Sequence, residues 1–377
     1  MRRICCAVSF FFGGLCFIYY FIYPVLIIYY KMATLNKYLF AGFSVLLLAA
    51  AIYYLFSSTS PSGDVVVVYV SHDQDYSEPI LKDFEKETGI RVKAVYDTEA
   101  SKTVGLVNRL IAEKNRPQAD VFWNNEVSRT ILLKENGILA PYLSPNAADK
   151  PDIFKDSEGY WTGFAARARV IIYNTDLVSE NDAPKGLKDL LDPRWKGKVG
   201  IGNPLIGTTG SQVAALYSLW GDDAAEQYLK DLKANDVKVV EGNGMVKDQV
   251  ASGDLYMGLT DSDDAHDALV DGKPVAEVYP DQGAGGIGTL IIPNSVMLIK
   301  GAPHPENGKK LIDYVLSKKV EQALAESKAV QMPLGKDVPH PKDVPSIADV
   351  KAMSVSLYQV YGKLNSSQEF VRNILVT

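Results

Sequence analysis

Three aspartates follow an apolar run in the second half of the chain. Residues 255–260 have the composition of a buried strand, and Asp261, Asp263 and Asp264 come directly after them. Neighbouring carboxylates repel one another and are costly to desolvate, so such a cluster needs a cation, hydrogen-bond donors or full solvation. Open α/β sheets bind ligands outside the carboxyl ends of their strands. The spacing therefore predicts a site for a positive ligand such as a metal ion, with a solvated helix cap as the simpler interpretation.

Strands and helices alternate on both sides of this site, which predicts an α/β fold. Residues 65–70 are nearly all valine, typical of a strand buried on both faces. Ser77 begins a helical pattern that Gly89 ends. Further strands are predicted at residues 91–96, 119–123, 169–173, 198–201, 238–240 and 290–299, and further helices at 104–111, 212–220, 223–234, 305–316 and 319–327. In the run 290–299, Pro293 marks the place where we expect the ladder of hydrogen bonds to break.

Charge and cysteine content restrict the class of function. The chain has 377 residues and a net charge of −6, but its first 63 residues carry four basic side chains and no acid. The rest has 35 basic and 45 acidic residues, a net charge of −10, which excludes a nucleic-acid backbone as the expected partner. Cys5, Cys6 and Cys16 all lie in the first segment, so the body has neither disulfides nor thiolate metal ligands.

The first 63 residues form a separate region with two apolar runs, 4–30 and 38–56. Each run is long enough to cross a bilayer, so a two-span hairpin is one interpretation. We prefer a start at Met32, because Lys37, an apolar stretch and a polar linker at 57–63 then form a signal peptide or an uncleaved signal anchor. We therefore expect the body in the periplasm or at the outer face of the cytoplasmic membrane.

Several short motifs lie in a fixed order along the body. They are Val-Tyr-Val-Ser-His-Asp (68–73), Phe-Glu-Lys-Glu-Thr-Gly-Ile-Arg-Val (84–92), Ala-Asp-Val-Phe-Trp (119–123), Arg-Ala-Arg-Val (167–170), Asp-Pro-Arg-Trp-Lys-Gly (192–197) and Ala-Pro-His-Pro (302–305). Their order resembles the ferric-iron-binding branch of the periplasmic solute-binding proteins of ABC importers. The resemblance covers residues 65–340 and implies a monomeric receptor without enzymatic activity, which delivers its ligand to an ABC permease in the membrane.

The resemblance also implies the arrangement of the fold. The family has a two-lobe periplasmic-binding-protein fold, type II-like, in which each lobe is a mainly parallel sheet flanked by helices and the ligand cleft lies between the lobes. We expect lobe 1 to comprise residues 64–166 and about 290–345, and lobe 2 to comprise residues 167–289 and about 346–377. Residues 290–299 then form a strand between the lobes.

The resemblance places metal ligands at three turns. An acid after the first strand corresponds to Asp73, and a glutamate after the third strand corresponds to Glu126. The adjacent tyrosines that typify ferric coordination are replaced here by Asp263 and Asp264, with Asp261 beside them. Carboxylates are hard ligands that suit calcium, magnesium, manganese and iron alike. We expect a metal ion, with Fe3+ as the first candidate, and the substitution leaves its identity open.

Other polar residues are expected to contact the ligand or an accompanying anion. The family holds a synergistic anion at a glycine-rich turn, and the start of a helix at Thr208, Thr209 and Gly210 has suitable donors. We expect only one of Arg167 and Arg169 to face the cleft. The remaining candidates for ligand contact are Ser71, His72, Asn125 and Asn243.

Two alternatives to metal uptake remain open. The same receptor scaffold in related proteins binds organic ligands, so a phosphonate, a phosphorylated compound or an amine is the second hypothesis. The arginines favour an anion and the aspartate cluster favours an amine. The third hypothesis is a metal-dependent enzyme that uses the aspartates, for which the chain shows no supporting motif.

Overall fold

The computed structural model describes residues 64–97 and 104–376. The chain divides into two units after Gly63, and the fold described is that of the second unit. Our predictions of a signal or anchor segment, a linker and a start at Met32 lie outside the described residues. Across the described ranges, no helix combines the length and apolar composition that a membrane span requires.

The first group of strands is built around β1, which pairs in parallel with β2 on one side and β3 on the other. The valine-rich sequence of β1 is buried along nearly its whole length, as predicted. Helix α3 ends at Gly89, which has a φ of 72° and whose N–H donates to the carbonyl of Glu85. The bounds are β1 Val65–Val70, β2 Arg91–Tyr96, β3 Val121–Asn124, β4 Leu139–Ala140, α3 Gln74–Thr88, α4 Val104–Ala112 and α5 Val127–Glu135.

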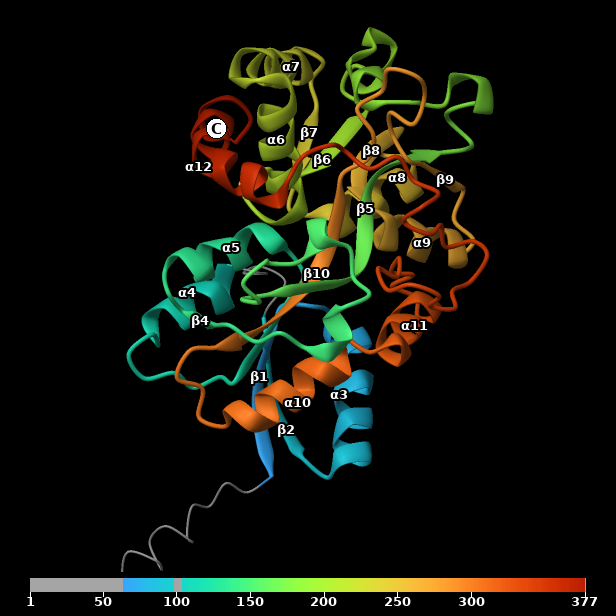
Figure 1. Ribbon diagram of the computed structural model, residues 1–377. Helices are drawn as coiled ribbons and strands as arrows, with labels where there is room; N and C mark the ends of the chain where they lie inside the picture. Colours follow the sequence, from blue (N-terminus) through green and yellow to red (C-terminus); the bar gives the residue numbers. More distant parts are fainter. Residues whose placement is uncertain (1–63, 98–103, 377) are drawn as a thin grey trace, which may run out of the picture. The chain divides into compact units, whose positions relative to one another are not determined.

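The second group is built in the same way around β6, which pairs in parallel with β7 and β8. Helices α6, α7, α8 and α9 follow or connect these strands (Figure 1). The bounds are β6 Val199–Gly202, β7 Lys238–Val240, β8 Met257–Asp261, β9 Val275–Val278, α6 Gly207–Trp220, α7 Asp222–Ala234, α8 Asn243–Ser252 and α9 Ser262–Val270.

Two long antiparallel strands, β5 (Thr162–Asn174) and β10 (Ile291–Ile299), connect the two groups. β10 pairs with β3 in the first group, and β5 pairs with β8 and β9 in the second. The register between them shifts at Pro293/Asn294, where we predicted a break in the ladder. In Figure 1 these strands run between the two groups of helices. Every residue of both strands is buried, so the link between the groups is part of the core.

The expectation of mainly parallel sheets is wrong. Parallel pairing is confined to β1, β2 and β3 and to β6, β7 and β8, whereas every pair that includes β5 or β10 is antiparallel. The sheet is therefore mixed, because the chain crosses between the groups on antiparallel strands. The carboxyl ends of the parallel strands still place the turns after β1, β3 and β8 around one site.

The final elements cover the outside of both groups. Helix α12 packs against α6 and α7 of the second group and against α5 of the first. The sequence analysis did not predict α12, because its apolar positions are interspersed with asparagine, glycine and serine. The bounds of these helices are α10 Pro305–Val315, α11 Lys318–Glu326 and α12 Leu357–Ile374.

Candidate functional site

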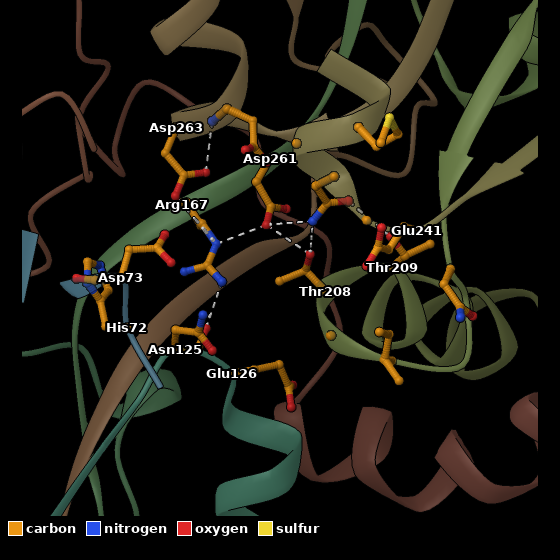
Figure 2. A pocket seen from close by; sticks show the side chains of 18 of the residues that line it. His72, Asp73, Asn125, Glu126, Arg167, Thr208, Thr209, Glu241, Asp261 and Asp263 are labelled. Carbon is orange, nitrogen blue, oxygen red and sulfur yellow. Dashed lines mark hydrogen bonds and ion pairs between the residues drawn. The ribbon is translucent and has the colours of Figure 1, made fainter. Parts of the chain in front are cut away.

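A cavity of about 390 Å³ lies where the turns after β1, β3 and β8 meet the first turns of α6 and α8 (Figure 2). Most of the residues selected from the sequence line it: His72, Asp73, Asn125, Glu126, Arg167, Thr208, Thr209, Asn243, Asp261, Asp263 and Asp264. The structure therefore brings together turns that are almost 200 residues apart in the sequence.

Two selected residues do not line the cavity. Ser71 is buried, and its hydroxyl donates to the carboxylate of Asp97. Gly210 lies inside α6, where an added Cβ would come within 3.2 Å of the carbonyl oxygen of Pro204. Each of these residues supports the wall of the site from behind.

Several lining residues were missed by the sequence analysis, and two of them are acids. Glu241 comes directly after β7, and Asp73 and Asp263 likewise lie within three residues of the end of a strand. Asp248 lies on α8 beside Lys247, with 3.4 Å between Oδ1 and Nζ. Glu241 could have been identified, because ligands bind outside the carboxyl ends of strands. Asp248 could not, because it lies in a helix that we did not predict.

Asp261 accepts hydrogen bonds from four side chains around the site. Its Oδ1 accepts a hydrogen bond from Nη1 of Arg169 at 2.6 Å, and its Oδ2 accepts one from Nε of Arg167 at 3.0 Å. Oδ2 also accepts from Oγ1 of Thr208 at 2.9 Å and from Nδ2 of Asn243 at 3.0 Å. Burial would raise the pKa of Asp261, but the charges of Arg169 and Arg167 lower it below its usual value. The carboxylate is therefore ionised, and its charge is balanced within the protein.

Both arginines reach Asp261, because residues two apart on a strand share a face. Of the two, only Arg167 lines the cavity. Arg169 lies behind Asp261 and is fully buried. Arg167 also donates from Nη2 to the carbonyl of Asn125 at 2.9 Å, so it connects the turn after β3 with β8.

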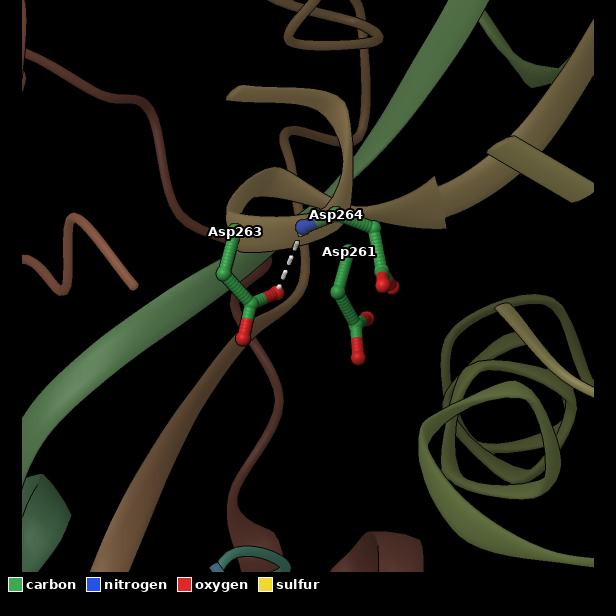
Figure 3. Close-up of side chains that lie close together, drawn as sticks. All are labelled: Asp261, Asp263 and Asp264. Atoms are coloured by element: carbon green, nitrogen blue, oxygen red, sulfur yellow. Dashed lines mark hydrogen bonds between the residues drawn. The ribbon is translucent and has the colours of Figure 1, made fainter. Parts of the chain in front are cut away.

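Asp263 and Asp264 occupy the first turn of α9, beside Asp261 (Figure 3). One carboxylate oxygen from each of the three residues lies within 4.8 Å of the others. Oδ1 of Asp263 accepts from the backbone N–H of Asp264 at 3.1 Å, and Oδ2 lies 3.9 Å from Nε of Arg167. Negative charge is favoured at a helix start, so the helix and the arginine partly stabilise this pair.

Glu126, which the resemblance implied as a metal ligand, lines the cavity and also caps a helix. Its Oε1 accepts from the backbone N–H of Ser128 at 2.7 Å and from the hydroxyl of Ser211 at 2.7 Å. Its Oε2 accepts from the N–H of Arg129 at 3.1 Å, which makes Glu126 the N-cap of α5. In Figure 2 the carboxylate points away from Asp261 and Asp263.

His72 has both ring nitrogens within hydrogen-bond distance of protein atoms. Nε2 lies 2.8 Å from the amide nitrogen of Gln331, and Nδ1 lies 3.3 Å from the carbonyl oxygen of Asp73. The ring packs against Trp123, with 5.4 Å between the centroids. These contacts favour a role for His72 in shaping the wall, next to Asp73.

The charge of the lining is strongly negative. Seven acidic side chains line the cavity, namely Asp73, Glu126, Glu241, Asp248, Asp261, Asp263 and Asp264, whereas the only arginine or lysine among the lining residues is Arg167. After the charge of Asp261 is matched by an arginine, an excess of carboxylates remains. Such a cavity attracts a cation or a molecule that carries one.

Comparison with known proteins identifies the class to which this fold and site belong. Residues 80–352 match the model of the bacterial extracellular solute-binding proteins, and the chain belongs to this family. The family consists of extracellular or periplasmic transport receptors without enzymatic activity, which bind a ligand for an ABC permease. Within it, the chain falls in the ferric-iron-binding-protein-like branch.

Curated relatives have two kinds of ligand in their names. Iron uptake protein A1 of Synechocystis is 28% identical over 77% of this chain and 81% of its own length. A putative 2-aminoethylphosphonate-binding periplasmic protein of Salmonella typhimurium is 31% identical over 81% of this chain and 88% of its own length.

Solved structures of the branch have the same α/β periplasmic-binding-protein fold. Iron-bound HitA from Pseudomonas aeruginosa superposes with a TM-score of 0.74 and 25% identity, over 82% of this chain and 99% of that chain. A Trichodesmium protein in complex with iron and citrate has a TM-score of 0.70 and 26% identity, over 83% and 100% of the two chains.

Proposed function

We propose that the protein is the extracytoplasmic receptor of an ABC importer and captures a metal cation, with iron as the first candidate. The observation that carries the proposal is the cluster of Asp261, Asp263 and Asp264 at the edge of a cavity rich in carboxylates. The names of its relatives, which include iron uptake and Fe3+-binding proteins, support iron among the possible cations.

The donors proposed for the cation are Asp263 and Asp264, with Asp73 from the turn after β1. Asp261 and Glu126 were also expected as ligands, but their carboxylates are engaged by arginines and by the N-terminus of α5, respectively. No tyrosine is among the lining residues. A purely carboxylate set would accept Fe3+, Mn2+ and Ca2+ with less discrimination than phenolates provide.

The cavity is much larger than a single ion requires, at about 390 Å³. We propose that a small anion enters with the metal and lies near Arg167 and the first turn of α6, where Thr208 and Thr209 line the cavity. The N–H groups at a helix start and a buried guanidinium both favour negative charge. One solved relative contains iron together with citrate.

We further propose that the two groups of strands are the lobes of a receptor that closes around its ligand. Residues 64–166 and about 290–345 form lobe 1, and residues 167–289 and about 346–377 form lobe 2. The strands β5 and β10 would act as the connection between them. The protein would work as a monomer in the periplasm or at the membrane surface, held by its N-terminal segment, and would dock on an ABC permease.

Calorimetry on the metal-stripped full chain tests this function. Titration with Fe3+ (as its citrate complex), Fe2+, Mn2+ and Ca2+ should give saturable heat and a rise in melting temperature for at least one ion. Absence of both signals for all four ions would exclude a metal receptor.

One observation favours a second candidate, an organic ligand with both an amine and an acid group. Arg167 is a buried guanidinium in a cavity that is also lined by seven acidic side chains, so the cavity offers one positive group and a larger number of negative ones. A relative at 31% identity is named as a putative 2-aminoethylphosphonate-binding protein. A thermal shift of metal-stripped protein by 2-aminoethylphosphonate, with none from any of the four ions, would favour this candidate.

A further inference from the structure

Three polar residues connect α5 and α6 beside the cavity, in a contact that the proposed function does not use. Ser128 lies in the first turn of α5, which follows β3 in the first group of strands. Ser211 lies on α6, which follows β6 in the second group. The hydroxyl of Ser211 donates to Oε1 of Glu126 at 2.7 Å and lies 3.2 Å from the hydroxyl of Ser128.

These contacts are shielded from water. Ser211 is 3% exposed, Glu126 4% and Ser128 1%. A hydrogen bond to an ionised carboxylate is shorter and stronger than one between neutral groups, and a dry environment strengthens it further. Separation of the two helices would leave the Ser211 hydroxyl without this partner until water replaced it.

Glu126 is held rigidly on its own side of the contact. Two backbone N–H groups of α5, from Ser128 and Arg129, fix the orientation of its carboxylate. The same oxygen that binds the N–H of Ser128 accepts the hydroxyl of Ser211, so little acceptor capacity remains for a cation. The carboxylate is therefore preorganised to bind the hydroxyl on α6.

We propose that Ser211 and Glu126 form a latch that holds the two walls of the cavity together and slows ligand release. Glu126 then acts in closure rather than as a ligand of the cation. The effect on release rests on the proposed function, because it takes this cavity as the binding site; the latch itself is a property of the free protein.

A distance measurement tests the latch without any ligand. The parent for this experiment is the full chain in which serine replaces Cys5, Cys6 and Cys16. Two spin labels are attached at exposed positions, through Glu135→Cys on α5 and Asp223→Cys on α7. Ser211→Ala should increase the ratio of long to short distances by about tenfold, because a hydrogen bond to a charged group is lost. If the distributions of Ser211→Ala and the parent coincide, there is no latch.

Ser218→Ala is the matched control on the same helix. The hydroxyl of Ser218 lies within hydrogen-bond distance of the carbonyl oxygens of Ala214 and Gln359, at 3.0 and 3.1 Å, and neither of these residues belongs to α5. This variant should keep the parent distribution; an equal shift in both variants would mean a general loosening of α6 and would overturn the proposal.

The rate of Fe3+ release tests the effect of the latch on the ligand. The protein is loaded with Fe3+ as its citrate complex, and a chelator captures the metal that is released. Ser211→Ala should release the metal about tenfold faster than the parent and Ser218→Ala. Equal rates would contradict control of release by the latch. If the parent binds no Fe3+, the metal version of the proposed function fails, and the distance measurement still decides on the latch.

Discussion

Asp261 and Arg169 form a buried ion pair behind the cavity, with 2.6 Å between Oδ1 and Nη1. Arg169 is fully buried, and Asp261 is 4% exposed. Arg167 completes the arrangement from the cavity side. A buried carboxylate between two guanidiniums is a structural counter-ion, so Asp261 has less to offer a bound cation than its neighbours in sequence.

Replacement of Asp261 by asparagine should therefore lower the free energy of unfolding. The change keeps the side-chain size but leaves Arg167 and Arg169 without their shared counter-ion, and loss of one partner of a buried pair costs about 3–5 kcal/mol. The free energy of unfolding, measured with urea, reports this loss. Asp182→Asn is the control, because its partner Arg194 is exposed; its effect should stay below about 1 kcal/mol. Equal effects would mean that Asp261 is not the counter-ion we describe.

The carboxylates of Asp263 and Asp264 should determine cation affinity. Asp263→Asn and Asp264→Asn each remove one negative charge from the cluster and should weaken binding of the responding ion by at least about tenfold, or 1.4 kcal/mol. Calorimetric titration gives the affinities. Asp254→Asn removes an exposed acid a few residues upstream and should bind the ion as the parent does. Unchanged affinity in both cluster variants would remove these residues from the site.

Glu277 should make the stability of the metal-free protein depend on pH. This carboxyl on β9 is partly buried, its Oε2 has no hydrogen-bond partner among the described residues, and burial together with the charge of Asp263 raises its pKa to about 7. The folded protein therefore retains a proton that the unfolded chain loses near the usual pKa of 4.5. The free energy of unfolding should fall by on the order of 3 kcal/mol as the pH rises from about 4.5 to 7, and no further above that.

Glu277→Gln should remove this part of the pH dependence and stabilise the protein at pH 8. Urea unfolding across the pH range measures the slope. Glu369→Gln, at an exposed position on α12, should retain the slope of the parent. A parent and a Glu277→Gln variant with the same slope would show that the carboxyl is not protonated in the fold.

Lys150 should be essential for stability, although it does not line the cavity. Its Nζ lies 2.8 Å from Oε2 of Glu321, and both side chains are fully buried. Glu321 also accepts from the N–H of Ala165 at 2.9 Å, which fixes a residue of β5 with a φ of 39°. Lys150→Met leaves the buried carboxylate with backbone donors alone and should cost about 3 kcal/mol in unfolding free energy. Lys336→Met, at an exposed position, should have almost no effect.

The positions of the candidate site residues were largely predictable, because of how α/β sheets are built. Asp73, Asn125 and Asp263 each follow the end of a strand, and these three strand ends meet at one cavity. Hydrophobic runs define the strands, and the carboxyl ends of parallel strands lie at one edge. Glu241 fits the same pattern, because it directly follows β7.

The roles of those residues were less predictable. The sequence determined a body with an α/β alternation, a negative charge and acids gathered at strand ends, because periodicity and composition are local properties. Only the tertiary structure decided that Asp261 faces two arginines, that Glu126 binds α5 and Ser211, and that Asp263 and Asp264 remain toward the cavity. The reason is that the state of a carboxylate depends on the charges and donors within a few ångströms, and here Arg167, Arg169, Thr208 and Ser211 lie 53 to 94 residues from the carboxylates that they contact.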